Sequence, residues 1–266
     1  MPSILFDLDG VFYQGDRAIA GAADVVAWAR DEAIPHLFVT NTTSRPRSAL
    51  VEKLAGFGID ATPGQIFTPA VAAVHWLEQQ CAKKYPGQKV ALFIPEATQS
   101  DFKPISLSDS EDDDVCAVVV GDLGEQWDFN TLNRAFRLLM HDNQPQLLAL
   151  GMTRYWQAAD GLRLDVAPFV MALSHASGVE PRVLGKPAPL FYQGALDVLG
   201  ASAEQAVMIG DDIVSDIGGA QDAGLRGLLV RTGKFRPQDL QGGIVPDGVL
   251  DSVRDLPEWW RQHRER

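Results

Sequence analysis

The stretch ILFDLDGV, residues 4–11, sets the expectation for the fold. Ile4–Phe6 form a short apolar run that is typical of a buried strand, and Asp7 and Asp9 follow directly. Alternate residues of a strand point to the same side, so both carboxylates are expected to face one crevice at the strand's carboxyl end. Gly10 lets the chain turn away sharply. Taken alone, the run fits a strand that ends in a polar turn equally well.

Short apolar runs alternate with segments of helical spacing along the rest of the chain. Strands are predicted at residues 36–40, 89–94, 115–120, 206–209 and 227–230, and helices at 20–31, 46–57, 71–80, 131–141, 190–199, 217–223 and 258–266. This alternation implies βαβ units and parallel strands covered by helices on both faces. The sequence therefore predicts an α/β fold with a Rossmann-like, doubly wound parallel sheet.

Composition bounds the classes of function. The 266 residues carry a net charge of −12, which argues against binding to nucleic acid or to an anionic membrane surface. Cys81 and Cys116 lie far apart in sequence and indicate a reducing compartment without a disulfide framework. No signal peptide and no apolar run long enough to span a bilayer is expected, so a cytoplasmic location is predicted.

Two polar motifs follow predicted strands in the middle of the chain. Thr40 and Asn41 end the strand at 36–40 and supply a hydroxyl and an amide that suit phosphate oxygens, although plain helix capping explains them alone. Lys186, in the run LGKP at residues 184–187, lies just before a predicted helix. A solvated lysine is the simpler explanation of that motif by itself.

The run MIGDDIVSDIGGA, residues 208–220, is the fourth motif. Asp211 falls at a strand end, whereas Asp212 and Asp216 are four residues apart and are expected on one helix face. Hard oxygen ligands at a strand end suit Mg²⁺. Helix capping accounts for Asp212 or Ser215 but not for Asp211.

The order of these motifs, each after a predicted strand, resembles the haloacid dehalogenase superfamily of phosphohydrolases. The long stretch between Asn41 and Lys186 resembles the branch with an inserted α/β cap of the C2 type. The runs VTNTT (39–43), GLRLDV (161–166), VLGKP (183–187) and VRTGKFRP (230–237) are similar to the NagD-like group, subfamily IIA, and especially to phospholysine phosphohistidine inorganic pyrophosphate phosphatase-like proteins. The glycine-lysine pair at 233–234 does not fit a P-loop.

This resemblance implies a role for each motif. Asp7 is the expected nucleophile, and Asp9 the expected acid and base. Mg²⁺ is expected on the carboxylates of Asp7 and Asp211 and on the backbone carbonyl of Asp9. Thr40, Asn41 and Lys186 are expected to bind phosphate, with Asp216 orienting Lys186 or a metal-bound water. The implied activity is Mg²⁺-dependent hydrolysis of small phosphorylated metabolites through an aspartyl-phosphate.

The same resemblance divides the chain into a catalytic core, residues 1–80 and 181–266, and a cap, residues 81–180. Two strands split by Asp160 and Gly161, at 155–159 and 162–166, are predicted to form a hairpin, near which Arg154, Tyr155 and Trp156 are candidates to contact substrate. Dimerisation through the cap occurs in similar proteins, so a homodimer is an open alternative to a monomer.

Position 9 departs from the closest group. Those relatives carry Ser where this chain has Asp9, which favours ordinary phosphate esters and weakens a direct transfer of phosphoamide or pyrophosphate specificity. Two other functions stay open: phosphoryl transfer to an acceptor other than water, and a non-catalytic protein that binds phosphometabolites and regulates a partner.

Overall fold

Two compact units make up the structure, a computed structural model that describes residues 2–158 and 160–263. Unit 1 comprises the chain up to Thr40, Ser48–Phe67 and the chain from Lys186 onward; unit 2 comprises Asn41–Arg47 and Thr68–Gly185. None of the described helices is both long and apolar enough to cross a membrane.

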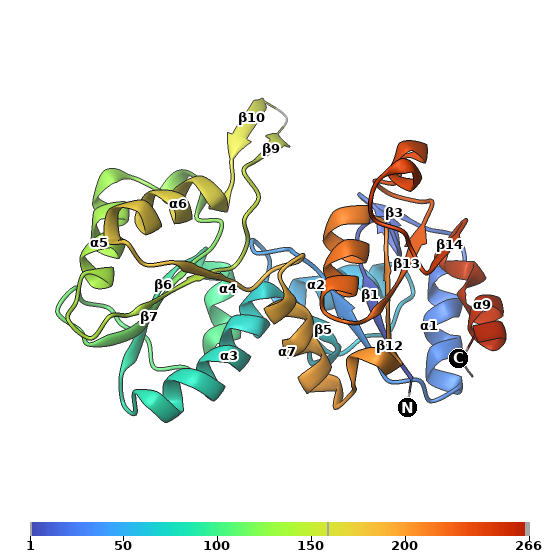
Figure 1. Cartoon of the computed structure of the whole chain (residues 1–266), viewed down its shortest axis with the longest axis horizontal. Helices are drawn as coiled ribbons and strands as arrows, with labels where there is room; N and C mark the ends of the chain where they lie inside the picture. The colour runs from blue at the N-terminus through green and yellow to red at the C-terminus, as the bar shows by residue number, and fades with distance from the viewer. Residues whose placement is uncertain (1, 159, 264–266) are drawn as a thin grey trace. The chain divides into compact units, whose positions relative to one another are not determined.

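Unit 1 is built on a six-stranded parallel sheet in the order β14-β13-β12-β1-β4-β5 (Figure 1). Its strands are β1 Ser3–Asp7, β4 His36–Val39, β5 Ile66–Phe67, β12 Ala206–Gly210, β13 Arg226–Val230 and β14 Gly248–Leu250. The central strands β1 and β12 are buried along their whole length, as expected for a parallel sheet with helices on both faces. The predicted α/β sheet is confirmed.

Helices cover both faces of this sheet. The helices of unit 1 are α1 Ala22–Asp31, α2 Arg47–Gly56, α7 Pro189–Leu199, α8 Gly219–Asp222 and α9 Leu256–His263. Ile4 and Phe6 of β1 point into one core with the apolar sides of α1, α2 and α9. Asp7 alternates with Phe6 and therefore belongs to the opposite side of the strand. A short hairpin, β2 Tyr13–Gln14 and β3 Arg17–Ala18, follows β1.

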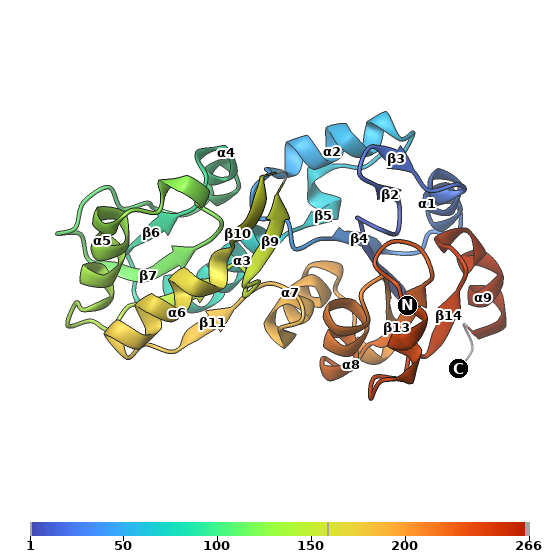
Figure 2. The same ribbon diagram turned by 90° about the horizontal axis from the view of Figure 1, so that it is seen from above.

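Unit 2 contains a four-stranded parallel sheet in the order β11-β8-β7-β6 (Figure 2). Its strands are β6 Lys89–Phe93, β7 Val115–Val120, β8 Gln146–Ala149 and β11 Pro181–Val183, and its helices are α3 Pro69–Lys84, α4 Glu96–Gln99, α5 Phe129–Leu139 and α6 Val166–Ser177. The apolar sides of α5 and α6 form one core with the sheet. Helix α3 also packs on β7. Because α3 makes these contacts within unit 2, the unit begins at Thr68, earlier than the boundary at residue 80 expected from the sequence.

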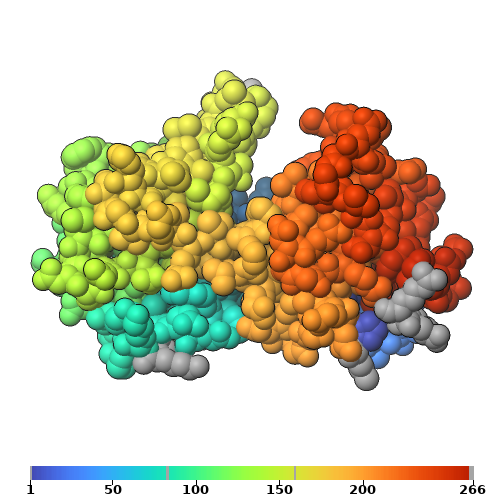
Figure 3. Space-filling model, viewed as in Figure 1, coloured from blue at the N-terminus to red at the C-terminus, as the bar shows by residue number. Residues whose placement is uncertain are grey.

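The predicted hairpin is present as β9 Tyr155–Ala158 and β10 Gly161–Leu164, paired antiparallel; residue 159 lies outside the described residues. The expected end of the second strand at Val166 is wrong. Asp165 accepts a hydrogen bond from the Val166 backbone N–H at 2.8 Å and caps helix α6, so the helix starts there. The hairpin exposes Tyr155, Trp156, Leu162 and Leu164, and it is the yellow projection of unit 2 in Figure 3.

Candidate functional site

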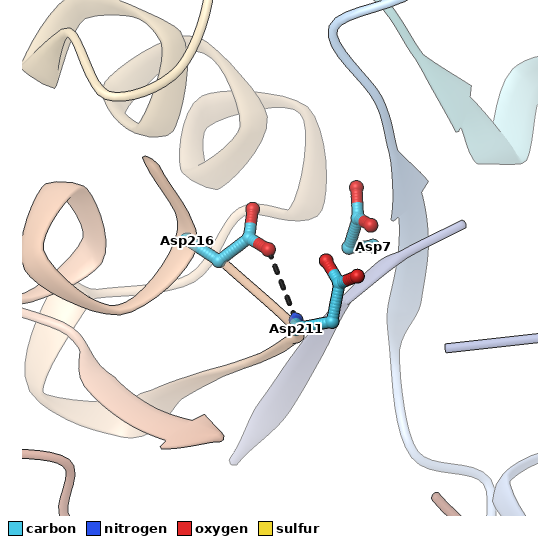
Figure 4. Close-up of side chains that lie close together, drawn as sticks. All are labelled: Asp7, Asp211 and Asp216. Carbon is cyan, nitrogen blue, oxygen red and sulfur yellow. Dashed lines mark hydrogen bonds between the residues drawn. The ribbon is translucent and has the colours of Figure 1, made fainter. Parts of the chain in front are cut away.

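Three aspartates of unit 1 meet at the carboxyl edge of its sheet (Figure 4). Asp7 is the last residue of β1, and Asp211 follows the adjacent strand β12. Asp216 comes from the turn after Asp211. One carboxylate oxygen of each lies within 4.8 Å of those of the other two, and all three residues are buried. The sequence motifs at residues 7 and 211 therefore do converge in space.

Lys186 joins two of these carboxylates. Its Nζ lies 2.5 Å from Asp7 Oδ1 and 2.7 Å from Asp216 Oδ1, and its side chain is only 3% exposed. A lysine is almost never buried without ionised partners, so the solvated lysine that explains the motif alone is excluded. The charged ammonium holds Asp7 and Asp216 at fixed positions on either side of it.

Asp216 is held by a local structure that the sequence did not predict. The expected regular helix from residue 217 is wrong at its start: Ile213–Gly218 form a π-helix, and α8 begins only at Gly219. Asp212 is the N-cap and accepts from the backbone N–H groups of Val214 and Ser215. The other oxygen of Asp216, Oδ2, accepts from the N–H groups of Asp211 and Asp212, each at 3.1 Å. π-Helical turns occur frequently at functional sites.

Two glycines let the backbone close over Asp211. Gly10 (φ 86°) and Gly233 (φ 66°) both adopt left-handed conformations, and a Cβ atom at either position would overlap the Asp211 carboxylate. The next residue, Lys234, donates its backbone N–H to Asp211 Oδ2 at 2.7 Å. Thr232 Oγ1 donates to the Gly10 carbonyl at 2.5 Å. The loop after β13 thus fixes the orientation of the Asp211 carboxylate.

Burial and like charges perturb the pKa values of the cluster. Burial raises the pKa of Asp7 to about 7, against the attraction of Lys186 and with further repulsion from Asp216 and Asp211. Burial likewise raises the pKa of Asp211 to about 6, opposed by the Lys234 N–H. Burial opposes the charge on Lys186, but Asp216 and Asp7 outweigh it and raise its pKa. Burial therefore disfavours the ionised form of both Asp7 and Asp211.

The donor set fits a hard divalent cation. Three ionised carboxylates against one ammonium would leave two uncompensated negative charges in a buried cluster. Both oxygens of Asp216 accept hydrogen bonds. Among the described residues, Asp7 accepts through Oδ1 and Asp211 through Oδ2. Asp7 Oδ2 and Asp211 Oδ1 are thus available, and Mg²⁺ is typically bound by one or two carboxylates plus waters.

The remaining predicted residues lie in different surroundings. Asp9 is exposed, and its backbone pairs with that of Tyr13. Thr40 is buried at the end of β4 and donates its backbone N–H to Phe67 O at 3.1 Å. Asn41 is exposed and begins the first segment of unit 2. The structure therefore brings together Asp7, Lys186, Asp211 and Asp216 as one cluster, with Asp9 two residues after Asp7.

Tyr192 is a supporting residue that sequence reasoning missed. It is fully buried in α7, and its hydroxyl donates to the carbonyl oxygens of Ser215 at 2.5 Å and Asp216 at 3.2 Å. These bonds hold the π-helix whose Asp216 side chain contacts Lys186. The only sequence signal was a tyrosine in an apolar helical run, which is equally typical of a core residue.

The variant Tyr192→Phe is expected to lower the free energy of unfolding by about 1–3 kcal/mol, because two carbonyls lose their buried donor. Denaturant titration measures this loss. Tyr155→Phe is the matched control, since Tyr155 is 51% exposed, and it is expected to leave the free energy of unfolding unchanged. An equal effect of both variants would contradict the bracing role of the Tyr192 hydroxyl.

Comparison with known proteins agrees with this geometry. A family model of haloacid dehalogenase-like hydrolases matches residues 4–106, and a HAD-hydrolase-like model matches residues 183–256. The chain is 38% identical to human phospholysine phosphohistidine inorganic pyrophosphate phosphatase over 99% of this chain and 95% of that protein. It is also 38% identical to bovine haloacid dehalogenase-like hydrolase domain-containing protein 2, over 90% and 87% of the two chains.

Solved structures share the whole fold. The p-nitrophenyl phosphatase from Archaeoglobus fulgidus superposes with a TM-score of 0.84 at 26% identity, covering 97% of this chain and 98% of that one. NagD from E. coli superposes with a TM-score of 0.83 at 22% identity, covering 96% and 98%. The resemblance inferred from the four motifs is confirmed. The chain belongs to the haloacid dehalogenase-like hydrolases and has a NagD-like fold.

Proposed function

We propose that this protein is a Mg²⁺-dependent phosphatase of small phosphorylated metabolites that acts through an aspartyl-phosphate on Asp7. The observation that carries the proposal is the buried cluster in which Lys186 Nζ contacts both Asp7 and Asp216 while Asp211 lies beside them. Buried carboxylates of like charge lower the stability of the fold unless cations balance them. Clusters of this kind are typical of functional sites rather than of a hydrophobic core.

Asp7 is the proposed nucleophile. One oxygen is held by Lys186, so the other is oriented for in-line attack on phosphorus. Two unit charges of like sign at ~4 Å repel by about 4 kcal/mol at an effective dielectric constant of 20, so an anionic carboxylate needs cations to approach a phosphate. Lys186 supplies one of them. Asp216 keeps this ammonium in place and charged.

The carboxylates of Asp7 and Asp211 and the carbonyl of Asp9 would hold the Mg²⁺. When bound, the ion neutralises charge on the phosphoryl oxygens and orients the phosphate toward Asp7. Lys186, the Thr40 hydroxyl and Asn41 are proposed to bind the same phosphoryl oxygens. Unit 2 is proposed to act as the cap that selects the leaving group, with Arg154, Tyr155 and Trp156 as candidate contacts.

Asp9 is the proposed general acid and base. It protonates the leaving oxygen in the first step and takes a proton from the attacking water in the second. Its carboxylate is exposed and, in the part of the chain that the structure describes, has no ion pair that would hold it away from substrate.

The variant Asp9→Asn is therefore expected to lose ~10²–10⁴-fold in kcat/KM on alkyl phosphates, which have poor leaving groups, and much less on p-nitrophenyl phosphate. Steady-state kinetics on the two substrates measure the difference. Asp16→Asn, which removes an exposed carboxylate from the turn between β2 and β3, is the control. Equal losses on both substrates would remove the acid role of Asp9.

The pKa values predict how stability depends on pH. Because the folded protein raises the pKa of Asp7 from 3.8 to about 7, the metal-free protein binds a proton that the unfolded chain releases. This contribution is complete below pH ~3.8 and is lost as the pH rises through about 7. In EDTA, the free energy of unfolding is expected to fall by roughly 2–3 kcal/mol between pH 5 and pH 8 from Asp7 alone.

Denaturant titrations at the two pH values test this expectation. Asp7→Asn should show a smaller fall, and Mg²⁺ should restore stability to the wild type at pH 8. A wild-type stability that rises between pH 5 and pH 8 in EDTA would contradict the raised pKa of Asp7.

Turnover of a substrate panel is the direct test of the proposed function. The panel comprises sugar phosphates, nucleotides, pyridoxal phosphate, phospholysine, phosphohistidine and pyrophosphate, ranked by kcat/KM with Mg²⁺. The name of the human relative includes the last three. Because Asp9 supplies an acid, phosphate esters are expected to rank above phosphoamides. Release of phosphate from at least one compound is the expected result. If compounds of the panel bind but none is hydrolysed, the proposed phosphatase activity is contradicted.

A further inference from the structure

The two cysteines of the chain meet inside unit 2. Cys81 lies in helix α3 and Cys116 in strand β7, and both are buried, with 5% and 3% of their surface exposed. Helix α3 packs on β7, and Cys81 and Cys116 both line one cavity there. Although the two cysteines are far apart in sequence, the fold therefore places them on packed elements of the same unit.

A cavity reaches both sulfur-bearing residues. It has a volume of about 310 Å³, and its wall includes Cys81 and Cys116 together with Tyr85, Gln88 and Pro104. This volume is about ten times the share of one liquid water, so a small solute has room at the pair.

The contact also makes the two sulfurs chemically different. The hydrogen bond from Cys81 lowers the pKa of Cys116, opposed by burial. The same bond, with burial, raises the pKa of Cys81. Cys116 is thus the sulfur that more readily becomes a thiolate, and the thiolate is the nucleophilic form. Cys81 keeps its proton and lies next to it.

We propose that Cys81 and Cys116 form a hydroperoxide-sensitive dithiol, which closes reversibly into a disulfide between α3 and β7. All the residues of this site belong to unit 2, whereas Asp7, Lys186, Asp211 and Asp216 belong to unit 1. The site is therefore independent of the proposed phosphatase chemistry.

The reaction balances in two steps. The Cys116 thiolate attacks one oxygen of the hydroperoxide; the O–O bond breaks, Cys116 becomes a sulfenic acid, and the other oxygen leaves as hydroxide or alkoxide and takes up a proton. The Cys81 sulfur then attacks the sulfenic sulfur and loses its proton, and water leaves as the S–S bond forms. Two thiols are oxidised, and one hydroperoxide is reduced to water or alcohol. A dithiol reductant reverses the change by exchange.

The test treats the native full-length protein with one to a few equivalents of hydrogen peroxide and then alkylates it in denaturant with iodoacetamide. The reduced protein is expected to take up two carbamidomethyl groups and the oxidised protein none. Peptide mapping is expected to show residues 81 and 116 linked within one chain, and dithiothreitol is expected to restore both sites. Far-ultraviolet circular dichroism before and after oxidation checks that the fold is kept.

Single variants separate the two sulfurs. Cys81→Ser is expected to stop at a sulfenic acid on Cys116 that dimedone traps, whereas Cys116→Ser is expected to react at least tenfold more slowly. Cys81→Ala and Cys116→Ala repeat the comparison if either serine variant fails to fold. Both thiols still open to alkylation after peroxide, a link between two copies of the chain, or a link that forms only in unfolded protein would each overturn the proposal.

Discussion

The Asp7→Asn variant is expected to lose at least ~10⁴-fold in kcat on p-nitrophenyl phosphate while keeping its fold. The amide has the shape of the carboxylate but is a poor nucleophile, and it offers the Mg²⁺ no negative charge. Lys186 keeps its contact with Asp216, which is 2.7 Å away, so no buried charge is left without a partner. Steady-state kinetics and circular dichroism measure the two parts of this expectation.

Asp16→Asn is the matched control for this variant. It removes the same charge from an exposed position nine residues further along the chain and is expected to retain wild-type turnover. Hydrolysis of p-nitrophenyl phosphate by Asp7→Asn at the wild-type rate would refute the nucleophile. A rate lost together with the circular dichroism signal would instead show that Asp7 is needed for folding, so both are measured on the same preparation.

Removal of divalent cations is expected to reduce turnover to background, and Mg²⁺ is expected to restore it. Without the ion, Asp7, Asp211 and Asp216 present an anionic cluster to an anionic phosphate, and Lys186 is the ammonium in contact with Asp7 and Asp216. Exhaustive treatment with EDTA, followed by titration with Mg²⁺ under a fixed substrate concentration, measures the effect.

The variant Asp211→Asn tests whether the dependence of turnover on Mg²⁺ involves the Asp211 carboxylate. It is expected to raise the Mg²⁺ concentration for half-maximal rate by ~10–100-fold, because a neutral amide replaces a charged ligand of a hard cation. Asp222→Asn, on the exposed side of α8, is the control and is expected to need no more Mg²⁺ than the wild type. Activity that survives chelation would contradict the proposed metal.

The parallel sheet could be predicted because its central strands contain continuous apolar runs, such as Ile4–Phe6 in β1. Such strands read as continuous runs, and β1, β4, β6, β7, β12 and β13 all coincide with predicted ones. The short edge strand β5 could not be predicted, because two residues are too few to show a hydrophobic pattern. Helix α6 was partly assigned to a strand because β-branched Val166 continues the pattern of the hairpin, whereas the Asp165 cap decides the boundary.

Those residues of the candidate site that belong to recognisable sequence motifs could be predicted. Four polar runs at strand ends were enough to indicate Asp7, Lys186 and Asp211, because parallel strands bring their carboxyl ends to one edge. The family resemblance added Asp216 as the residue that orients Lys186 or a metal-bound water, but the local backbone that places it could not be predicted. A regular helix turn would have placed Asp212 and Asp216 on one face; the π-helix instead aims Asp216 at Lys186 and leaves Asp212 as a cap.

Contacts between distant segments carried no sequence signal at all. The backbone N–H of Lys234 reaches Asp211 through a loop whose glycine-lysine pair fits no phosphate-binding motif. Tyr192 braces the π-helix from another helix, and Cys81 meets Cys116 across unit 2. Such pairs depend on how elements pack in space, which neither period nor spacing encodes.

A crystal structure of the protein with Mn²⁺ in place of Mg²⁺, with anomalous data collected for the metal, tests whether Asp7 and Asp211 share one divalent cation. One anomalous peak is expected within bonding distance of a carboxylate oxygen of Asp7 and one of Asp211, with Lys186 still between Asp7 and Asp216. A peak that contacts neither aspartate, or only one of them, at saturating Mn²⁺ would contradict a shared cation.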